Sequence, residues 1–400
     1  MAGPLDGLKI IDMTTVIMGP YMTQILADLG ADVIKVESPG GDTTRQVPPM
    51  RNQGMGAFYL QNNRNKRSIV IDMKKPDGLA TLLALLADAD AFVSNVRPAA
   101  LARLGLTDAV MAKANPGLVT MALVGFGQNG PYAADPAYDD LIQGLTAVPS
   151  MLVTAGSAHP HYVPLAFNDR AVGLHSGISL LAAIRHRDRT GEGQHIEVPM
   201  FETMVEFVMG DHMAGLTFNP PQGPPGYTRS LNADRRPYKT SDGHVCNIIY
   251  TDKHWRAFAK IIGRPDLLES DDRFANLGTR TVHAAFVYDF IGQFMPGKTT
   301  AEWIAILKDA DIPVTPLHTL ESIMDDPHLQ ATRYFQPFDH PSEGTLVQTG
   351  LPSRWSKTRR DGQRPAPRLG EQSAEILRQA GVAEAEIVRL CDNGTIVQAS

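Results

Sequence analysis

Residues 8–37, LKIIDMTTVIMGPYMTQILADLGADVIKVE, contain two apolar segments separated by a helical one. Leu8–Asp12 is a short apolar run typical of a buried strand. A Gly-Pro pair begins a helix that ends at Gly30, and Val33–Glu37 is the second strand. A strand, a helix and a strand in this order form a βαβ unit, so this stretch predicts a parallel sheet.

The alternation of strands and helices continues to about residue 125. Arg67–Asp72 is predicted as a strand, Pro76–Ala89 as a helix, and the apolar runs at 90–96 and 118–127 as further strands. This α/β pattern indicates an open, doubly wound parallel sheet. The turn after the first strand, MTTVIMGP, lacks the G-x-G-x-x-G pattern whose glycines let a backbone approach a pyrophosphate. The sequence therefore disfavours a nicotinamide cofactor.

A change in composition marks a second, smaller domain. Residues 214–237 are rich in proline and glycine, which is typical of a linker or a binding loop. A hairpin pattern follows, and then two predicted amphipathic helices, Asp252–Ile262 and Thr300–Ala310, that each contain a tryptophan. The sequence therefore predicts the first part of a large domain over 1–213, a linker over 214–237 and a small α+β domain over 226–325.

The composition of the 400-residue chain disfavours several classes of protein. A hydrophobic content of 43% supports a substantial core, and a net charge of −6 does not favour nucleic acid as a partner. The sequence has no apolar run long enough to span a membrane and no signal-peptide pattern. Cys246 and Cys391 lie far apart, so we expect free thiols and a cytoplasmic location. The twelve histidines show no metal-ligand spacing, so we expect no metal site.

Residues 164–202 contain a predicted helix with Asp169 at its beginning. Small residues among its apolar positions suit close packing against a neighbour, and Gly191 ends it. Backbone N–H groups at a helix start favour an anion, which suits a catalytic carboxylate. The alternative is that Asn168 or Asp169 caps the helix, and caps are far commoner than catalysts.

Two further groups of residues have both a functional and a structural interpretation. Basic residues are frequent in the first half of the chain, which suits a ligand with several phosphate groups or an ordinary solvated surface. Asp139 and Asp140 follow a loop that contains glycine and proline. A carboxylate there can hold the geometry of a nucleophile or act as an acid–base partner, or it can cap a helix.

Several segments together resemble the family III CoA-transferases, the group that contains formyl-CoA transferase, carnitine CoA-transferase and alpha-methylacyl-CoA racemase. The segments are PLDGLKIIDMTTVIMGPYMTQILADLGADVIKVE, NRNKRSIVIDMKKPDG, SNVRPAALARLGL, NPGLVTMALVGFGQNGPY, RHRDRTGEGQHIEVPMFE and DDPHLQATRYF. The resemblance covers the whole chain. It implies a Rossmann-like large domain to which the chain returns over 326–400, and ring-like subunits interlocked as a homodimer.

The resemblance also implies a mechanism in which Asp169 is the nucleophile. The aspartate attacks the thioester of an acyl-CoA to give a mixed anhydride and free CoA thiolate, and the thiolate then forms an aspartyl-CoA thioester. A carboxylic acid acceptor reverses these steps and leaves as its CoA ester. The implied substrates are thus an acyl-CoA and a carboxylic acid, with no tightly bound cofactor. The chemistry needs an ionised carboxylate that is shielded from water.

By position in the matching motifs, the resemblance implies a CoA site made of residues that follow the strands of the large domain. These residues are Ile17, Met18, Ser38, Ile71, Asp72, Met73, Lys74, Asn95, Val96, Arg97, Arg103, Pro136, Ala137, Tyr138 and Asp139.

The chain departs from formyl-CoA transferase at three places. Ile17 stands where that enzyme has a glutamine, and Ser38 stands where it has an arginine. Its tetraglycine loop has no counterpart, and residues 223–237 contain three arginines instead. These differences disfavour formate and oxalate as substrates. We hypothesise that one of these arginines binds the carboxylate of the acceptor: Arg229, Arg235 or Arg236.

Two alternatives to a CoA-transferase remain open. A racemase of the same fold pairs its aspartate with a histidine that exchanges the α-proton, but the corresponding residue here is Tyr138, and tyrosine is a poor acid–base group at neutral pH. A CoA-binding relative without turnover would bind CoA and form no acyl-enzyme. The presence of Asp169 argues against that alternative, and we expect transfer.

Overall fold

The computed structural model describes residues 3–358 and 362–399 and divides into two compact units. Within the described residues, the large unit comprises 3–142, 164–206, 331–358 and 362–399, and the small unit comprises Gln143–Val163 and Phe207–Gln330. Each unit has its own hydrophobic core. The chain therefore enters the small unit twice and returns to the large unit in its last 70 residues.

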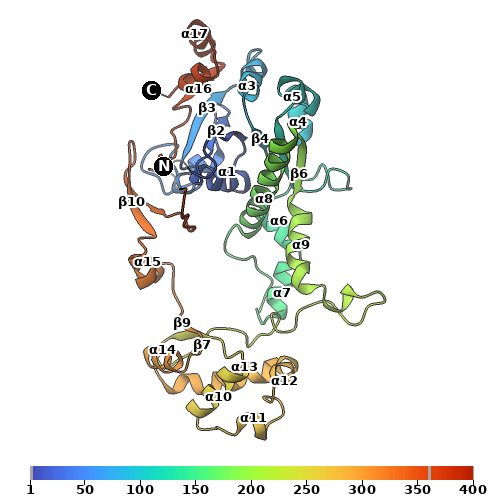
Figure 1. Ribbon diagram of the computed structural model, residues 1–400, viewed down its shortest axis with the longest axis vertical. Helices are drawn as coiled ribbons and strands as arrows, with labels where there is room; N and C mark the ends of the chain where they lie inside the picture. The colour runs from blue at the N-terminus through green and yellow to red at the C-terminus, as the bar shows by residue number, and fades with distance from the viewer. Residues whose placement is uncertain (1–2, 359–361, 400) are drawn as a thin grey trace. The chain divides into compact units, whose positions relative to one another are not determined.

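A seven-stranded sheet forms the centre of the large unit (Figure 1). Its spatial order is β12-β3-β2-β1-β4-β5-β6, and all neighbours are parallel except β12, which is antiparallel to β3. The strands are β1 (Lys9–Met13), β2 (Asp32–Glu37), β3 (Lys66–Ile71), β4 (Ala91–Ser94), β5 (Val119–Val124), β6 (His195–Pro199) and β12 (Ile396–Val397). The predicted α/β class and parallel sheet are confirmed.

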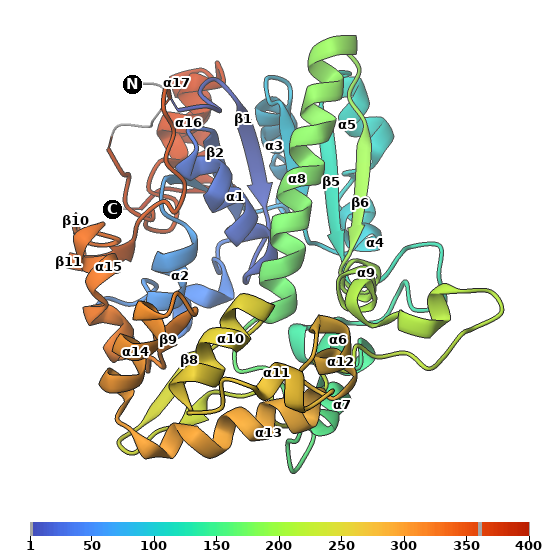
Figure 2. The same ribbon diagram turned by 60° about the horizontal axis from the view of Figure 1, so that its bottom comes forward.

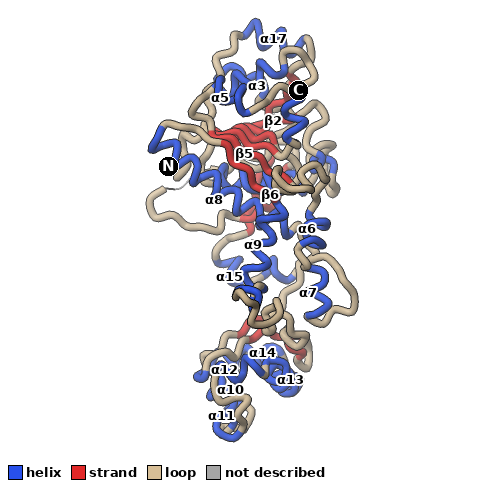
Figure 3. The backbone as a smooth tube through the Cα atoms, turned by 90° about the vertical axis from the view of Figure 1, so that its right-hand side faces the viewer, coloured by secondary structure: helices blue, strands red, loops and turns tan. Residues whose placement is uncertain are grey.

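Helices cover both faces of this sheet, because successive side chains of a strand point to opposite faces. The core on one face contains Ile10 and Val33, and the core on the other contains Ile11 and Ile34. The first face packs against α1 (Met18–Asp28) and α8 (Phe167–Thr190), and the second against α3 (Gly78–Leu86), α5 (Asp108–Ala114), α16 (Ser373–Gln379) and α17 (Glu384–Asp392). Figure 2 shows α1 and α8 in front of the strands, and Figure 3 shows the strands among the helices that cover them.

The order of the strands reverses at β1, because β2 and β3 lie on one side of it and β4, β5 and β6 on the other. In open α/β sheets, ligands bind beyond the C-terminal ends of the strands at such a reversal. Here Met13 at the end of β1 pairs with Ser94 at the end of β4. The residues that follow these strands, 14–17 and 95–97, therefore lie where a ligand is expected.

The other elements of the large unit are short, apart from α9. They are η1 (Thr43–Gln46), α2 (Ala57–Asn62), α4 (Pro98–Arg103), α6 (Asp139–Leu145), α9 (Met200–His212) and the hairpin of β10 (Phe335–His340) and β11 (Gly344–Thr349). Helices α6 and α9 each contribute residues to both units. The sequence predicts a long loop over 40–65, which is wrong at η1 and α2. Tyr59 and Leu60 are buried in a small core of their own, and this burial stabilises α2 within an otherwise polar segment.

The small unit contains a three-stranded antiparallel sheet of β7 (Tyr238–Lys239), β8 (His244–Asn247) and β9 (Val314–Pro316). Its helices are α7 (Val148–Thr154), η2 (Ala214–Thr217), α10 (Asp252–Ile261), α11 (Leu267–Ser270), α12 (Leu277–Val282), α13 (Ala284–Phe294), η3 (Met295–Gly297), α14 (Thr300–Asp309), η4 (Ser322–Asp325) and, for most of its length, α15 (Pro327–Ala331). Trp255 on α10 and Trp303 on α14 are buried in its core, as their amphipathic patterns predict. None of the helices among the described residues is both long and apolar enough to cross a membrane.

Candidate functional site

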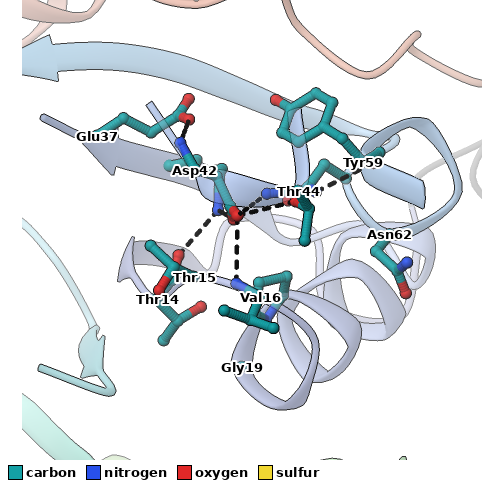
Figure 4. Close-up of polar contacts among 12 residues, drawn as sticks. Thr14, Thr15, Val16, Gly19, Glu37, Asp42, Thr44, Tyr59 and Asn62 are labelled. Atoms are coloured by element: carbon teal, nitrogen blue, oxygen red, sulfur yellow. Dashed lines mark hydrogen bonds and ion pairs between the residues drawn. The ribbon is translucent and has the colours of Figure 1, made fainter. Parts of the chain in front are cut away.

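The loop between β1 and α1 has a strained backbone at the reversal point of the sheet. Val16 has a φ of 75°, in the left-handed region that a β-branched residue rarely adopts. Such a conformation costs about 1–3 kcal/mol and persists only where the surroundings hold it. Two side chains hold this loop. Asn95 accepts a hydrogen bond from the backbone N–H of Thr15 at 3.1 Å and donates to its carbonyl at 2.9 Å. Asp42 accepts from the N–H of Val16 at 3.3 Å (Figure 4).

A buried network of charged groups supports Asp42. Both Asp42 and Lys35 are fully buried, and the Lys35 ammonium donates to the Asp42 carboxylate at 2.9 Å and to the carbonyl of Thr14 at 2.8 Å. Glu37 accepts from the backbone N–H of Asp42, as Figure 4 shows. Burial acts to raise the pKa of Asp42, but Lys35 and the hydrogen bonds from Thr44 outweigh it, and the pKa lies below its usual value. The carboxylate is therefore ionised and fixed beside the strained loop.

A pocket of about 250 Å³ lies beside this loop. Thr15 and Val16 line it together with residues of the loops that follow β4 and β5. Five of the residues predicted for a CoA site are in its wall: Asn95, Arg97, Pro136, Ala137 and Tyr138. The structure thus brings together predicted residues from two separate segments of the chain at the position where a doubly wound sheet binds ligands.

The other predicted CoA-site residues do not line this pocket. Ile17 and Met18 are buried at the start of α1, and Ser38 is exposed just after β2. Ile71 ends β3, and Asp72, Met73 and Lys74 follow it in a turn. Val96 adjoins the pocket residues Asn95 and Arg97, Arg103 is exposed at the end of α4, and Asp139 begins α6. Most of these residues follow strands of one parallel sheet, and so they lie along its C-terminal edge.

Asp169 lies in the first turn of α8 and does not cap it. The N-cap position is Ala166, whose side chain accepts no hydrogen bond. The cap is supplied by Asp139, whose carboxylate accepts from the backbone N–H groups of Asn168 at 2.8 Å and Asp169 at 3.0 Å. The capping role considered for Asn168 and Asp169 is therefore wrong. Because Asp139 occupies these donors, the carboxylate of Asp169 has no capping task.

The pKa of Asp169 is raised to about 7. Burial is the main cause, and the nearby carboxylate of Asp139 adds to it. Arg170 and a hydrogen bond from the backbone N–H of Met18 act in the opposite direction. The start of α8 therefore does not lower the pKa of its own aspartate, and the donor that faces this carboxylate belongs to the first residue of α1. At pH 7 the side chain is divided between its ionised and neutral forms.

Helices α1 and α8 approach each other closely at Gly173. A Cβ atom at this position would lie 2.9 Å from the carbonyl oxygen of Met18, closer than real contacts allow. At Gly177, one turn further along α8, a Cβ atom would lie 3.6 Å from the Met22 side chain, an ordinary contact. Close packing therefore requires a glycine at Gly173 but not at Gly177, and Gly173 allows the backbone of Met18 to approach α8 near Asp169.

We expect opposite stability effects from alanine at these two glycines. Gly173→Ala should lower the free energy of unfolding by about 1–3 kcal/mol, because the backbone of Met18 must shift. Gly177→Ala should raise it by about 0.5–1 kcal/mol, because alanine is the better helix former. Urea unfolding of both variants checks this pair, and equal changes in both would contradict the packing argument.

Sequence reasoning does not identify Val16 or Asp42 as site residues. A valine carries no signal for a positive φ, and Asp42, after two glycines, has the pattern of an ordinary turn residue. Arg229, Arg235 and Arg236 belong to the small unit, where all three line one pocket of about 410 Å³. Among the described residues, no group of three or more histidine, cysteine, aspartate or glutamate side chains is arranged to hold a metal ion.

Known proteins resemble this chain over almost its whole length. A family model described as CoA-transferase family III matches residues 5–373. The succinate–glutarate CoA-transferase of Agrobacterium fabrum is 31% identical over 392 residues, which cover 95% of this chain and 96% of that protein. The succinyl-CoA:mesaconate CoA-transferase of Haloarcula hispanica is 29% identical, with 95% of this chain and 97% of that protein covered. A crystal structure of a CAIB/BAIF family protein from Brucella suis matches with a TM-score of 0.79 and 29% identity over 95% of this chain and 100% of that chain.

Proposed function

Because the chain belongs to CoA-transferase family III, as its resemblance predicts, we propose that it transfers coenzyme A from an acyl-CoA to a carboxylic acid through covalent intermediates on Asp169. One observation supports this role for Asp169 above all others. Its carboxyl group is partly buried, has no capping task and has a pKa raised to about 7. Perturbed carboxyl groups of this kind are typical of catalytic positions.

The raised pKa suits a nucleophile. A more basic carboxylate is a better nucleophile, and a pKa near 7 leaves much of it ionised at neutral pH. An oxygen of Asp169 attacks the thioester carbon, the C–S bond breaks, and the CoA thiolate leaves. The thiolate then attacks the Asp169 carbonyl carbon and the donor acid departs as its carboxylate. A second carboxylate repeats both steps in reverse, so no net proton transfer is needed.

The backbone N–H of Met18 provides a donor for these steps. It hydrogen-bonds the Asp169 carboxylate in the free protein. When the Asp169 carbonyl carbon becomes tetrahedral, negative charge develops on its oxygen, and a fixed donor stabilises that charge. The rigid loop of Thr14–Ile17, fixed by Asp42 and Asn95, places this donor before the substrate arrives.

Coenzyme A is proposed to bind along the C-terminal edge of the sheet, at the predicted CoA-site residues. Its three phosphate groups need cationic partners. Lys74 and Arg97 are exposed on loops near this edge, and Arg103 is exposed at the end of α4, so all three are suitable partners.

The names of several relatives include succinate, glutarate or mesaconate, so the CoA esters of these acids are the donors to test first. Intact-mass analysis after exposure to each ester, quenched with hydroxylamine, tests the proposal: an adduct on Asp169 supports it. Absence of any adduct, together with exchange of an α-proton for deuterium, would favour a racemase instead.

The rate of adduct formation is expected to rise with pH, with a midpoint near 7. Only the ionised form of Asp169 attacks, and its pKa is about 7. In Asp139→Asn the like charge is removed while the amide oxygen can still accept the helix N–H groups, so the midpoint should move to lower pH. Quenched-flow mass spectrometry from pH 5 to 9 measures it. Asp140→Asn, at an exposed neighbour, is the matched control, and an unchanged midpoint in Asp139→Asn would contradict the explanation.

Two interlocked subunits are proposed for the assembly, in a cytoplasmic setting. A ring-like subunit requires a chain that leaves one unit and returns to it, and this chain does so: β12 pairs with β3 after the chain has passed through the small unit. The register joins Ile396 to Ile71. Light scattering of the purified protein should give twice the mass of 43.5 kDa, and a monomer at micromolar concentration would contradict the interlock.

A further inference from the structure

The small unit contains a larger pocket than the one beside the sheet. Its volume is about 410 Å³, within the range of small-molecule sites. All of its lining residues belong to the small unit. They come from β7 and the segment before it, from β8 and the residues after it, from α10, α12 and α13, and from β9 and the residue before it. The pocket is therefore complete within this unit and does not depend on Asp169.

The wall of this pocket is rich in cations. Four arginines line it, and none of the lining residues is an aspartate or glutamate: the arginines are Arg229, Arg235, Arg236 and Arg280. Two of the four already have carboxylate partners, because Arg236 lies 3.4 Å from Asp234 and Arg280 pairs with Asp252. Arg229 and Arg235 carry charge without an ion pair among the described residues. A surplus of positive charge in a concave site favours an anionic ligand.

Arg229 is held in place by neutral groups. Its Nε donates to the hydroxyl of Tyr288 at 3.0 Å, and its guanidinium lies 5.4 Å from the ring centre of Tyr250. Both tyrosines line the pocket. These contacts orient the guanidinium and leave its charge uncompensated, so it can form a bidentate pair with an incoming carboxylate.

The same pocket has an apolar floor. It is lined by three buried apolar side chains, Trp255, Val287 and Ile291. Such a surface favours an apolar part of a ligand, because a charged group placed against it would lose its hydration without compensation. Two polar atoms in the wall are also buried without a hydrogen-bond partner among the described residues, Oδ1 of Asn247 and Nε of Arg280. A ligand that matches this pocket has an apolar body, one anionic end and few other hydrogen-bonding groups.

We propose that this pocket binds a free organic acid, with its carboxylate on Arg229 and its apolar body against Trp255. The choice of an acid as ligand rests on the proposed function, because a CoA-transferase consumes and releases free acids. A phosphate-bearing ligand suits the site less well, since only two of its arginines lack a carboxylate partner and most of its floor is apolar. The binding itself needs no CoA and no turnover.

Titration calorimetry with the full-length protein and no CoA tests the proposal. Hexanoate is the probe, and hexanamide, phosphate and CoA are the comparisons. We expect hexanoate to bind, hexanamide to bind at least tenfold more weakly, and Arg229→Gln to weaken hexanoate by about tenfold or more, because a hydrogen bond between charged groups is lost. The second variant is Arg235→Gln, at an exposed position of the pocket wall. It should weaken hexanoate binding less than Arg229→Gln does. Arg256→Ala, an exposed arginine of α10 outside the pocket, should change nothing.

The outcomes separate this inference from the proposed function. Hexanoate binding that Arg229→Gln leaves unchanged would overturn the inference, as would stronger binding of phosphate or CoA with the same dependence on Arg229. Asp169→Ala should bind hexanoate as the wild type does, because the pocket lies in the other unit. Acid binding without any covalent adduct on Asp169 would refute only the proposed function, and transfer activity without acid binding at Arg229 would refute only the inference.

Discussion

Replacing Asp169 with asparagine is expected to lower kcat for CoA transfer by about 10⁴-fold or more, the loss seen when a catalytic nucleophile is removed. Asparagine keeps the shape of the side chain and one acceptor oxygen, but its amide forms no anhydride. No covalent adduct should appear with any acyl-CoA. Steady-state rates and intact mass measure both effects, and a variant that retains a tenth of the wild-type rate would show that the nucleophile lies elsewhere.

Two controls separate this chemical effect from damage to the fold. Asp140→Asn changes an exposed carboxylate in the same region and should retain activity. The second control is stability. The pKa of Asp169 is raised from 3.8 to about 7, so the folded protein holds this proton more tightly than the unfolded chain. The free energy of unfolding therefore falls as pH rises between these values. Asparagine does not titrate, and at pH 8 the unfolding midpoint of Asp169→Asn should equal or exceed that of the wild type.

Replacing Asp42 with alanine is expected to lower the free energy of unfolding by about 3–5 kcal/mol, because it leaves a buried charge without its partner. That charge is Lys35, which is fully buried. Burial acts to lower the pKa of Lys35, but the carboxylates of Asp42 and Asp12 outweigh it and raise the pKa, so the ammonium stays charged in the wild type. The variant also loses the acceptor for the strained N–H of Val16. Urea unfolding followed by circular dichroism measures the loss.

The control for Asp42→Ala is a variant that breaks an ion pair on the surface. Asp88 pairs with Lys9, and its side chain is 76% exposed. Such pairs contribute little, so Asp88→Ala should leave the unfolding curve nearly unchanged. If Asp42→Ala shifts the curve no more than Asp88→Ala does, the buried network does not hold the loop as described.

The parallel sheet is predictable from sequence because its strands are buried on both faces, and continuous apolar runs such as LKIID are easy to recognise. The last strand is not predictable in this way. Ile396–Val397 has only two residues, and it becomes a strand because β3 offers an edge about 325 positions earlier in the chain. The inclusion of residues 143–163 in the small unit has no composition signal either.

In the candidate site too, some features can be predicted from the local sequence and others depend on residues far away in the chain. Asp169 is found through its resemblance to a family motif, and the close packing around Gly173 through small residues at helical spacing. The role of Asp139 as the cap of α8 is not visible in the sequence, because 30 positions separate it from the N–H of Asp169. Local rules assign a cap to the nearest polar residue. Burial, together with the charge of this distant carboxylate, also raises the pKa of Asp169, whereas a helix start alone is expected to lower it.

The return of the chain to the sheet constrains how the protein is made. Ile376, Leu377, Ile387 and Leu390 complete the core on one face of the sheet, and they are synthesised after the whole small unit. Until they emerge from the ribosome, Ile34, Ile69 and their neighbours on that face remain partly uncovered. A nascent chain of the first 370 residues is therefore expected to expose apolar surface of the kind that chaperones bind. Truncation by about 30 residues removes α16, α17 and β12 together, so such a fragment lacks the edge strand and much of this core.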